Sequence, residues 1–332
     1  MQDCSSLYQK IGDEFQLGRL VSIETIQILW SGYGELVRVK FPKNSIIIKH
    51  IKLPQPSSHP RGWNTDFSHK RKLHSYQVEV NWYKNFSKTI DENCRMPQGL
   101  KCFQTNEEFL IVMEDLASVG FTSVISYAYK THLKACLSWL ANFHGKYMGV
   151  KSDIIWETGT YWHLDTRPDE FELLEDKQLK DYAKTIDKVL QNTKYQTIVH
   201  GDAKLANFCF NIQGTSCAAV DFQYVGHGCG MKDIAYFMSS AIDPEACEQN
   251  EEWILDTYFD ALELALKNYK KEIDIEKLEE EWRPLFSVAW ADFQRFLKGW
   301  SPNHFKINEY SDELTTKALA YLKNKNLQKE KI

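Results

Sequence analysis

The feature that most constrains the fold is a change of pattern along the chain, from short strand-like runs to helical periodicity. Three runs rich in β-branched and aromatic residues, separated by turn residues, predict an antiparallel meander with strands at 26–30, 36–41 and 45–53. From about Thr131 onward the chain is predicted to be mostly helical, and at 131–148 apolar residues recur with a period of about 3.6 residues, which is typical of a helix with one buried face. The pattern therefore predicts an α+β protein.

Further segments connect these two parts of the chain. A Pro- and Ser-rich stretch at 53–68 is interpreted as a surface loop, and a helical segment is predicted at 69–90. An apolar strand is predicted at 107–116. Two later strand-like runs, at 197–202 and 216–225, interrupt the helices and suggest a short central hairpin.

We place the division between two lobes at the end of the strand that closes the first part. Residues 1–115 are expected to form a small N-terminal lobe with an antiparallel sheet, ending in a hinge. Residues 116–332 are expected to form a larger C-terminal lobe, which is helical again from about Pro244 to Asn324. Because active sites favour the seam between two such units, we expect the functional residues there.

Length and composition exclude several classes of protein. The 332 residues, 43% of them hydrophobic, can bury a core without metal or disulfide staples. A formal net charge of −5 argues against binding to the nucleic-acid backbone. The eight cysteines form no C-x-x-C pair and are interpreted as reduced thiols. With no signal-like N-terminus and no apolar window of membrane-spanning length, we expect a cytoplasmic protein without membrane insertion.

The most informative stretch is HGDAKLANF at 200–208, followed by Asp221 and Phe222. Phosphoryl transfer requires a carboxylate that orients the attacking hydroxyl and Mg²⁺ that neutralises phosphate oxygens. Asp202 is the candidate base, and Asn207 and Asp221 are candidate Mg²⁺ ligands, because this ion prefers hard oxygen donors. Either element alone is typical of an ordinary turn or strand end. Their order, with apolar β-residues before each, favours the functional interpretation.

Two neighbours of the candidate base complete this loop. Lys204 stands two residues after Asp202, where an ammonium group could meet the transferring phosphoryl group. His200 is interpreted as a scaffold of the loop, since a second general base beside Asp202 would be redundant.

HGDAKLANF, VDFQ at 220–223 and GMKDIAYF at 230–237 together resemble the aminoglycoside phosphotransferase and choline kinase superfamily, in particular its ecdysteroid kinase-like branch. The resemblance covers most of the chain, from about residue 26 to residue 300. It implies a bilobal protein-kinase-like fold that uses ATP and Mg²⁺. It also implies that Asp233 is a buried acid that braces the catalytic loop.

The resemblance extends to the nucleotide side of the site. LWSGYGELVRVKF resembles the hairpin that covers the nucleotide, although Gly32 and Gly34 are the only glycines of a full G-x-G-x-x-G. VMEDL, which contains Glu114 and Asp115, resembles the hinge that reads adenine with backbone groups.

A lysine and a glutamate are expected to hold the phosphates. Lys49, at the end of the third predicted strand, is placed to meet the α- and β-phosphates, and Glu79 is placed to fix it by an ion pair. A surface acid is the alternative interpretation of Glu79. Lys40 is the alternative lysine, but it ends a strand before a turn and is expected to be solvated.

The acceptor side is marked less clearly. Aromatic residues gather in the irregular segment 156–171 and on later helices, where they could line a ligand site or belong to the core. These are Trp156, Tyr161, Trp162, Trp282, Trp290, Phe293, Phe296 and Trp300, with His163 and Arg167 among the first group.

The segment after Asp221 bears on the kind of acceptor. Only twelve positions separate Asp221 from Asp233, without Ala-Pro-Glu, which leaves little room for a peptide platform. Gln223 stands where protein kinases carry glycine, so a large in-out movement of this loop is not expected. The sequence therefore favours a kinase that phosphorylates a hydroxyl of a small molecule. The alternatives are a nucleotide-binding pseudokinase or regulatory module, and a protein kinase.

Overall fold

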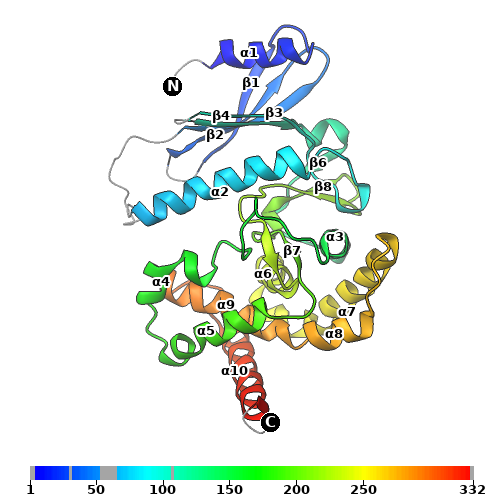
Figure 1. The fold of residues 1–332 in the computed structure, drawn as a ribbon. Coiled ribbons are helices and arrows are strands. Elements are labelled where there is room, and N and C mark those ends of the chain that lie inside the picture. Colours follow the sequence, from blue (N-terminus) through cyan, green and yellow to red (C-terminus); the bar gives the residue numbers. More distant parts are fainter. Residues whose placement is uncertain (1–3, 30–31, 53–65, 106–107, 330–332) are drawn as a thin grey trace.

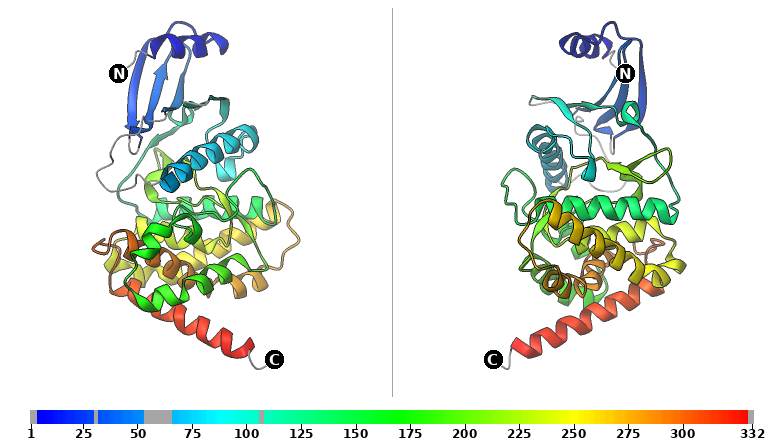
Figure 2. Two further views of the ribbon diagram at one scale, coloured as in Figure 1. Left: turned by 60° about the vertical axis from the view of Figure 1, so that its left-hand side comes forward. Right: turned by 90° about the vertical axis from the view of Figure 1, so that its right-hand side faces the viewer.

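The computed structural model describes residues 4–29, 32–52, 66–105 and 108–329. The chain forms two lobes: a sheet flanked by helices α1 and α2, and a larger helical lobe on the other side of α2 (Figures 1 and 2). This is the predicted α+β bilobal architecture of a protein-kinase-like fold. Most of the predicted loop at 53–68, and Trp30 of the first predicted strand, lie outside the described residues.

The five-stranded sheet has the order β1-β2-β3-β5-β4, with each neighbouring pair antiparallel. Its strands are β1 (Ser22–Ile28), β2 (Gly34–Lys40), β3 (Ser45–Lys52), β4 (Gly99–Gln104) and β5 (Glu108–Glu114). The predicted meander is present, although β1 begins earlier in the chain than expected. The sequence analysis missed β4, an edge strand that is only partly buried and mixes polar with apolar residues.

Alternation along β3 directs its side chains to the two faces of the sheet. On one face, Ile46 and Ile48 pack with Tyr8 of α1 (Ser5–Glu14), a helix that the sequence analysis did not predict. On the other face, Ile47 and Ile51 belong to the main core, together with residues of α2 (Asp66–Asn85). Lys49 shares the face of Ile47 and Ile51, so β3 presents it to α2.

The C-terminal lobe is built from helices, as predicted, and the last third of the chain is helical throughout most of its length. Helix α3 packs against α7, and α9 packs against α5, α6 and α10 (Figure 1). The helices are α3 (Lys130–Tyr147), α4 (Pro168–Glu172), α5 (Lys177–Gln191), α6 (Met231–Ala241), α7 (Pro244–Asn268), α8 (Ile275–Trp282), α9 (Leu285–Trp300) and α10 (Glu309–Lys329). Among the described residues, no helix combines the length and apolarity needed to cross a membrane.

Short strands frame the centre of this lobe, but they pair differently from the prediction. The two predicted runs form β7 (Thr197–Val199) and β9 (Cys217–Ala219), which are not partners of each other. Instead, β9 forms a hairpin with β8 (Phe208–Asn211), and β7 pairs with β10 (Gly226–Gly228). The turn after β8 contains Gly214 at φ +67°, which closes the hairpin locally, whereas β7 runs directly into the HGDAKLANF loop. β6 (Phe121–Ser123) adds a third strand beside β8.

Candidate active site

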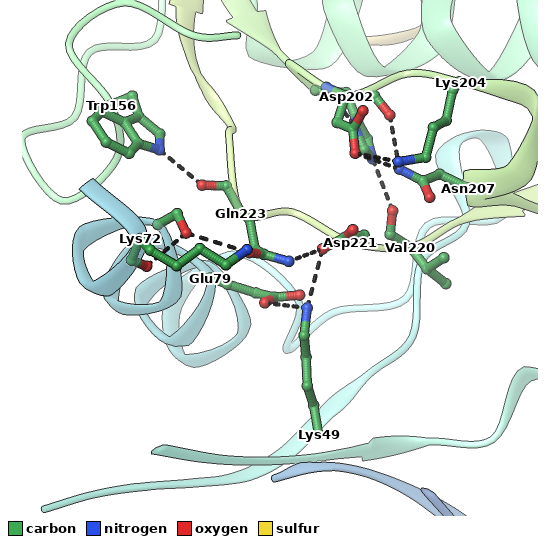
Figure 3. A network of polar contacts seen from close by, with 12 residues as sticks. Lys49, Lys72, Glu79, Trp156, Asp202, Lys204, Asn207, Val220, Asp221 and Gln223 are labelled. Carbon is green, nitrogen blue, oxygen red and sulfur yellow. Dashed lines mark hydrogen bonds and ion pairs between the residues drawn. The ribbon is translucent and has the colours of Figure 1, made fainter. Parts of the chain in front are cut away.

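The structure brings together a lysine, a glutamate and an aspartate that are far apart in the sequence (Figure 3). Lys49 Nζ lies 2.6 Å from Glu79 Oε2 and 3.0 Å from Asp221 Oδ1. Lys49 comes from β3, Glu79 from α2, and Asp221 from the segment after β9. One ammonium group therefore links both lobes through two carboxylates.

Burial and charge pull the pKa values of these three groups in opposite directions. Burial alone lowers the pKa of Lys49. The Asp221 and Glu79 carboxylates outweigh the effect of burial, so the pKa of Lys49 lies above its usual value. For Asp221, burial alone raises the pKa. The positive charges of Lys49 and Lys204 outweigh the effect of burial, so the pKa of Asp221 falls well below its usual value. For Glu79, burial prevails over the attraction of Lys49 and raises the pKa to about 7. Lys49 and Asp221 are therefore the firmly charged pair.

The alternative lysine has a different environment. Lys40 lies at the end of β2, with a side chain that is 49% exposed, and pairs with Glu24 at 3.1 Å. The side chain of Lys49 is 6% exposed. An exposed ion pair such as Lys40 with Glu24 contributes little to stability. A buried ammonium group between two carboxylates, such as that of Lys49, is held in a defined position.

Substitution of the two lysines should separate them. We expect Lys49→Met to lower kcat/KM for ATP by about 10²–10³-fold, because it removes a preorganised cation from the site. Lys40→Met should stay within about twofold of the parent enzyme, as is usual for surface changes. Steady-state kinetics of the two variants, with melting temperatures as the control for folding, make this comparison. The reverse ranking would show that the nucleotide lysine had been assigned to the wrong strand.

The HGDAKLANF loop places two polar side chains around one carboxylate (Figure 3). Lys204 Nζ donates to Asp202 Oδ2 at 2.9 Å. Asn207 Nδ2 donates to the same oxygen at 3.1 Å and to the Asp202 carbonyl oxygen at 2.8 Å. These bonds fix the Asp202 carboxylate, and they orient Asn207 so that its amide carbonyl oxygen is the atom that could serve a metal ion.

Asp233 braces this loop from α6. Its carboxylate accepts hydrogen bonds from the backbone N–H of His200 at 2.6 Å and of Gly201 at 2.9 Å. His144 Nε2 of α3 donates to Asp233 at 3.1 Å, and the Tyr258 hydroxyl of α7 lies 2.8 Å from the other ring nitrogen of His144. Burial alone raises the pKa of Asp233. These donors outweigh the effect of burial, so the pKa of Asp233 is lowered. A buried carboxylate with this many donors stays ionised and holds the loop.

Gly201 is required by the shape of the loop. Its φ is +78°, and a Cβ at this position would lie 2.1 Å from the Tyr224 carbonyl oxygen. Any side chain here would push the candidate base away from its supports.

His200 joins the catalytic loop to the segment that carries Asp221. Its Nε2 donates to the Val220 carbonyl oxygen at 3.0 Å, and its Nδ1 accepts from the Asp202 backbone N–H at 3.3 Å. The ring is completely buried, and this burial lowers its pKa. A buried neutral imidazole with both nitrogens in use fits the predicted scaffold role.

Phe222 and Gln223 anchor the segment after Asp221, which itself has φ +69°. The Phe222 ring is completely buried, stacks on Trp82 of α2 at a centroid distance of 5.1 Å, and lies 4.8 Å from the His200 ring. The Gln223 amide donates to Asp221 Oδ1 at 2.5 Å and accepts from Lys72 of α2 at 2.9 Å (Figure 3).

Gln223 has two further bonds. Its side-chain oxygen accepts from Ser75 at 3.3 Å, and its backbone carbonyl accepts from Trp156 Nε1 at 2.8 Å. The sequence analysis noted the departure from glycine but not this network, because its partners lie on a distant helix and loop. Gln223 therefore ties α2, Asp221 and the irregular segment to one another.

The predicted hinge acids use their side chains within the protein. Glu114 Oε1 and Oε2 each lie 2.7 Å from Arg95 Nη2. Asp115 accepts from Arg38 Nε at 2.7 Å and from Ser45 Oγ at 2.6 Å. Their carboxylates brace the connection between the lobes, and the contact of backbone groups with adenine stays a prediction.

The two glycines of the predicted hairpin lie where the resemblance requires a tight turn. Gly32 has φ +74° and Gly34 has φ +127°. A Cβ on Gly34 would lie 2.0 Å from the His50 carbonyl oxygen on β3, so this position excludes a side chain. In the part of the chain that the structure describes, nothing lies within 4 Å of a Cβ built on Gly32.

Most aromatic residues of the last helices belong to the core. Trp282, Trp290, Phe293 and Phe296 are almost completely buried. Two tyrosines were not singled out as a pair by the sequence analysis: Tyr161 of the irregular segment and Tyr236 of α6, whose ring centroids are 5.4 Å apart. Burial raises the pKa of the Tyr236 hydroxyl, and hydrogen bonds involving Tyr161 and Asp202 raise it further.

Comparison with known proteins bears on the family. Residues 155–271 match the ecdysteroid kinase-like family. The matched segment contains the catalytic loop, Asp221 and the Asp233 brace, so the resemblance drawn from these motifs is confirmed. The sequence matches no curated protein at a significant level.

Two solved structures show the same fold as this chain. An ethanolamine kinase from Plasmodium vivax has a TM-score of 0.51 at 14% identity, with 95% of this chain and 87% of that chain covered. The amicoumacin kinase hAmiN, in complex with AMP-PNP, Ca²⁺ and Ami, has a TM-score of 0.50 at 14% identity, with 98% and 96% covered. The fold of this chain is thus shared with two small-molecule kinases.

The donor set of the site fits a nucleotide with its metal ion. Asn207 and Asp221 offer hard oxygen atoms, which Mg²⁺ prefers, and Mg²⁺ usually takes few carboxylates from a protein. Among the described residues, no cluster of three or more His, Cys, Asp and Glu side chains could hold a metal by itself. The two oxygen donors therefore fit an ion that is shared with phosphate groups, beside the ammonium of Lys49.

Proposed function

We propose that this protein transfers the γ-phosphate of ATP, with Mg²⁺, to a hydroxyl group of a small molecule. The observation that carries the proposal is the assembled arrangement of Lys49, Glu79, Asp221, Asn207 and Asp202. These residues come from both lobes and supply the parts that phosphoryl transfer requires.

Asp202 acts on the acceptor hydroxyl. Its carboxylate is held by Lys204 and Asn207, so it can accept a hydrogen bond from the hydroxyl and orient the attacking oxygen. As the new O–P bond forms and the bond from the γ-phosphorus to the leaving oxygen of ADP breaks, the hydroxyl proton passes to Asp202. Lys204 stabilises the negative charge beside this step.

Lys49 and Asp221 act on the nucleotide side. Lys49, held by Glu79, would bind the α- and β-phosphates, and Asn207 and Asp221 would hold Mg²⁺. The metal ion, when bound, supplies positive charge that neutralises the phosphate oxygens. The low pKa of Asp221 supports this assignment, because the carboxylate stays ionised and can bind a cation.

A small molecule is favoured over a peptide as the acceptor. After Gln223 the chain enters β10, which pairs with β7, and then turns directly into α6 at Met231. The backbone of this segment is already used in strand pairing and in the start of a helix. This supports the expectation that no peptide platform is built here.

A transfer experiment tests the proposal. The protein is incubated with labelled ATP and either a metabolite extract or a peptide library, and labelled products are separated by chromatography. We expect label on metabolites and none on peptides. Transfer to peptides alone would favour a protein kinase, and ATP binding without transfer to any hydroxyl, water included, would favour a pseudokinase.

A further inference from the structure

A lysine outside the matched segment lies beside the catalytic loop. Lys306, between α9 and α10, donates from Nζ to Ser239 Oγ of α6 at 3.3 Å. The adjacent Ser240 accepts from the backbone N–H of Leu205 at 3.0 Å, within the HGDAKLANF loop. Lys306 therefore contacts α6 at the residue next to the one that supports the catalytic loop.

Aromatic rings surround the Lys306 ammonium. Its nitrogen lies 5.0 Å from the ring centroid of Tyr236 and 5.4 Å from that of Phe293. Tyr236 packs against Tyr161, and both belong to an apolar cluster with Phe296. An ammonium group that is largely removed from water and faces aromatic rings favours a partner that can accept a hydrogen bond.

The Lys306 ammonium forms no ion pair with a carboxylate of the described residues. The Asp202 carboxylate and the Lys204 ammonium lie close enough to act on it in opposite directions. Asp202 is already bound by Lys204 at 2.9 Å. Burial lowers the pKa of Lys306 to about 8, so the ammonium remains mostly protonated at neutral pH. Lys306 thus has no carboxylate of its own, whereas Lys204 pairs with Asp202 and is also close enough to Asp221 to act on it.

We propose that Lys306 is an acceptor-binding residue that selects a hydroxy acid with an apolar ring over an amino alcohol. The inference rests on the proposed function, because it concerns the second substrate of the same site. A carboxylate on the acceptor would supply the ion-pair partner that Lys306 lacks and would accept a hydrogen bond from it. An amino alcohol would bring a third ammonium group next to Lys204 and Lys306, which like charges oppose. The partly exposed ring of Tyr161 suits an apolar body.

Two probes that differ in charge test the inference. Mandelate and phenylethanolamine each carry a phenyl ring and a hydroxyl group, but one bears a carboxylate and the other an ammonium group. Dissociation constants are measured by ligand-observed NMR without ATP. We expect mandelate to bind about tenfold more tightly or better, the size of one charge-assisted hydrogen bond. Lys306→Met should remove this preference, Lys306→Glu should reverse it, and Lys306→Arg should keep it.

Controls separate this inference from loss of folding and from the proposed function. Lys317→Met removes an exposed lysine that pairs with Glu251 at 3.3 Å, and it should leave the preference unchanged. Circular dichroism and melting temperatures show whether each variant is folded. Equal binding of both probes, no binding of mandelate, or a preference that survives in folded Lys306→Met would overturn the inference. Absence of phosphate transfer in the labelled-ATP experiment would instead contradict the proposed function.

Discussion

Asp202→Asn should lower kcat by about 10²–10⁴-fold, which corresponds to roughly 3–5 kcal/mol in the barrier. The amide has the same shape as the carboxylate, but it cannot take the proton of the acceptor hydroxyl. Its effect on ATP affinity should be small, because the proposed contacts to the nucleotide come from Lys49 and Asp221, which do not depend on the Asp202 charge.

The measurement is a pair of experiments on the same preparation. Single-turnover kinetics report the rate of transfer, and calorimetry reports the affinity for Mg·ATP. Activity within tenfold of the parent enzyme would contradict the role assigned to Asp202. A large loss of ATP affinity would place Asp202 on the nucleotide instead of the acceptor.

Asp221→Ala should abolish Mg²⁺-dependent binding of ATP. This carboxylate is the firmly ionised member of the central network, because Lys49 and Lys204 hold its pKa down against the effect of burial. Without it, Asn207 is the one remaining proposed metal ligand, and Lys49 loses its partner at 3.0 Å. Neutral oxygen alone is a poor ligand set for Mg²⁺.

Calorimetric titration of ATP with and without Mg²⁺ measures this effect. Asp153→Ala, at an exposed acid before the irregular segment, serves as the matched control and should bind Mg·ATP like the parent protein. The Asp221 variant must keep its circular dichroism spectrum. Unchanged affinity for Mg·ATP in a folded variant would show that the metal ion is bound elsewhere.

Local pattern predicted the parts of the fold that have strong local signals. Strands β2, β3 and β5 combine β-branched residues with turn residues at their ends, and α3 has a clear apolar stripe. Helix α1 was missed because it is short and gets its stability from packing against the sheet, through Tyr8 and Ile11. The pairing of β7 was wrong because β-partners depend on contacts far along the chain.

In the candidate site, too, the sequence predicted the residues that lie in local motifs and missed those that tertiary contacts bring together. Asp202, Asn207, Asp221 and Asp233 could be found because three short motifs carry them. Lys306 could not be found, because no pattern near residue 306 indicates that this loop returns to the catalytic loop. The contact of Gln223 with Lys72 spans 151 residues, and only tertiary structure reveals it.

The packing of Phe222 has a consequence for inhibition. In kinases whose Asp-Phe-Gly segment can turn over, a displaced phenylalanine vacates space that an inhibitor can fill. Here the ring is wedged between α2 and the catalytic loop, and the next residue is a glutamine that bonds to α2 and to Asp221. Turning the segment over would break these bonds and unstack the ring from Trp82. Compounds that compete with ATP should therefore have to fit the assembled site, and selectivity among them would come from the acceptor side of Asp202, where Lys306 and the tyrosines lie.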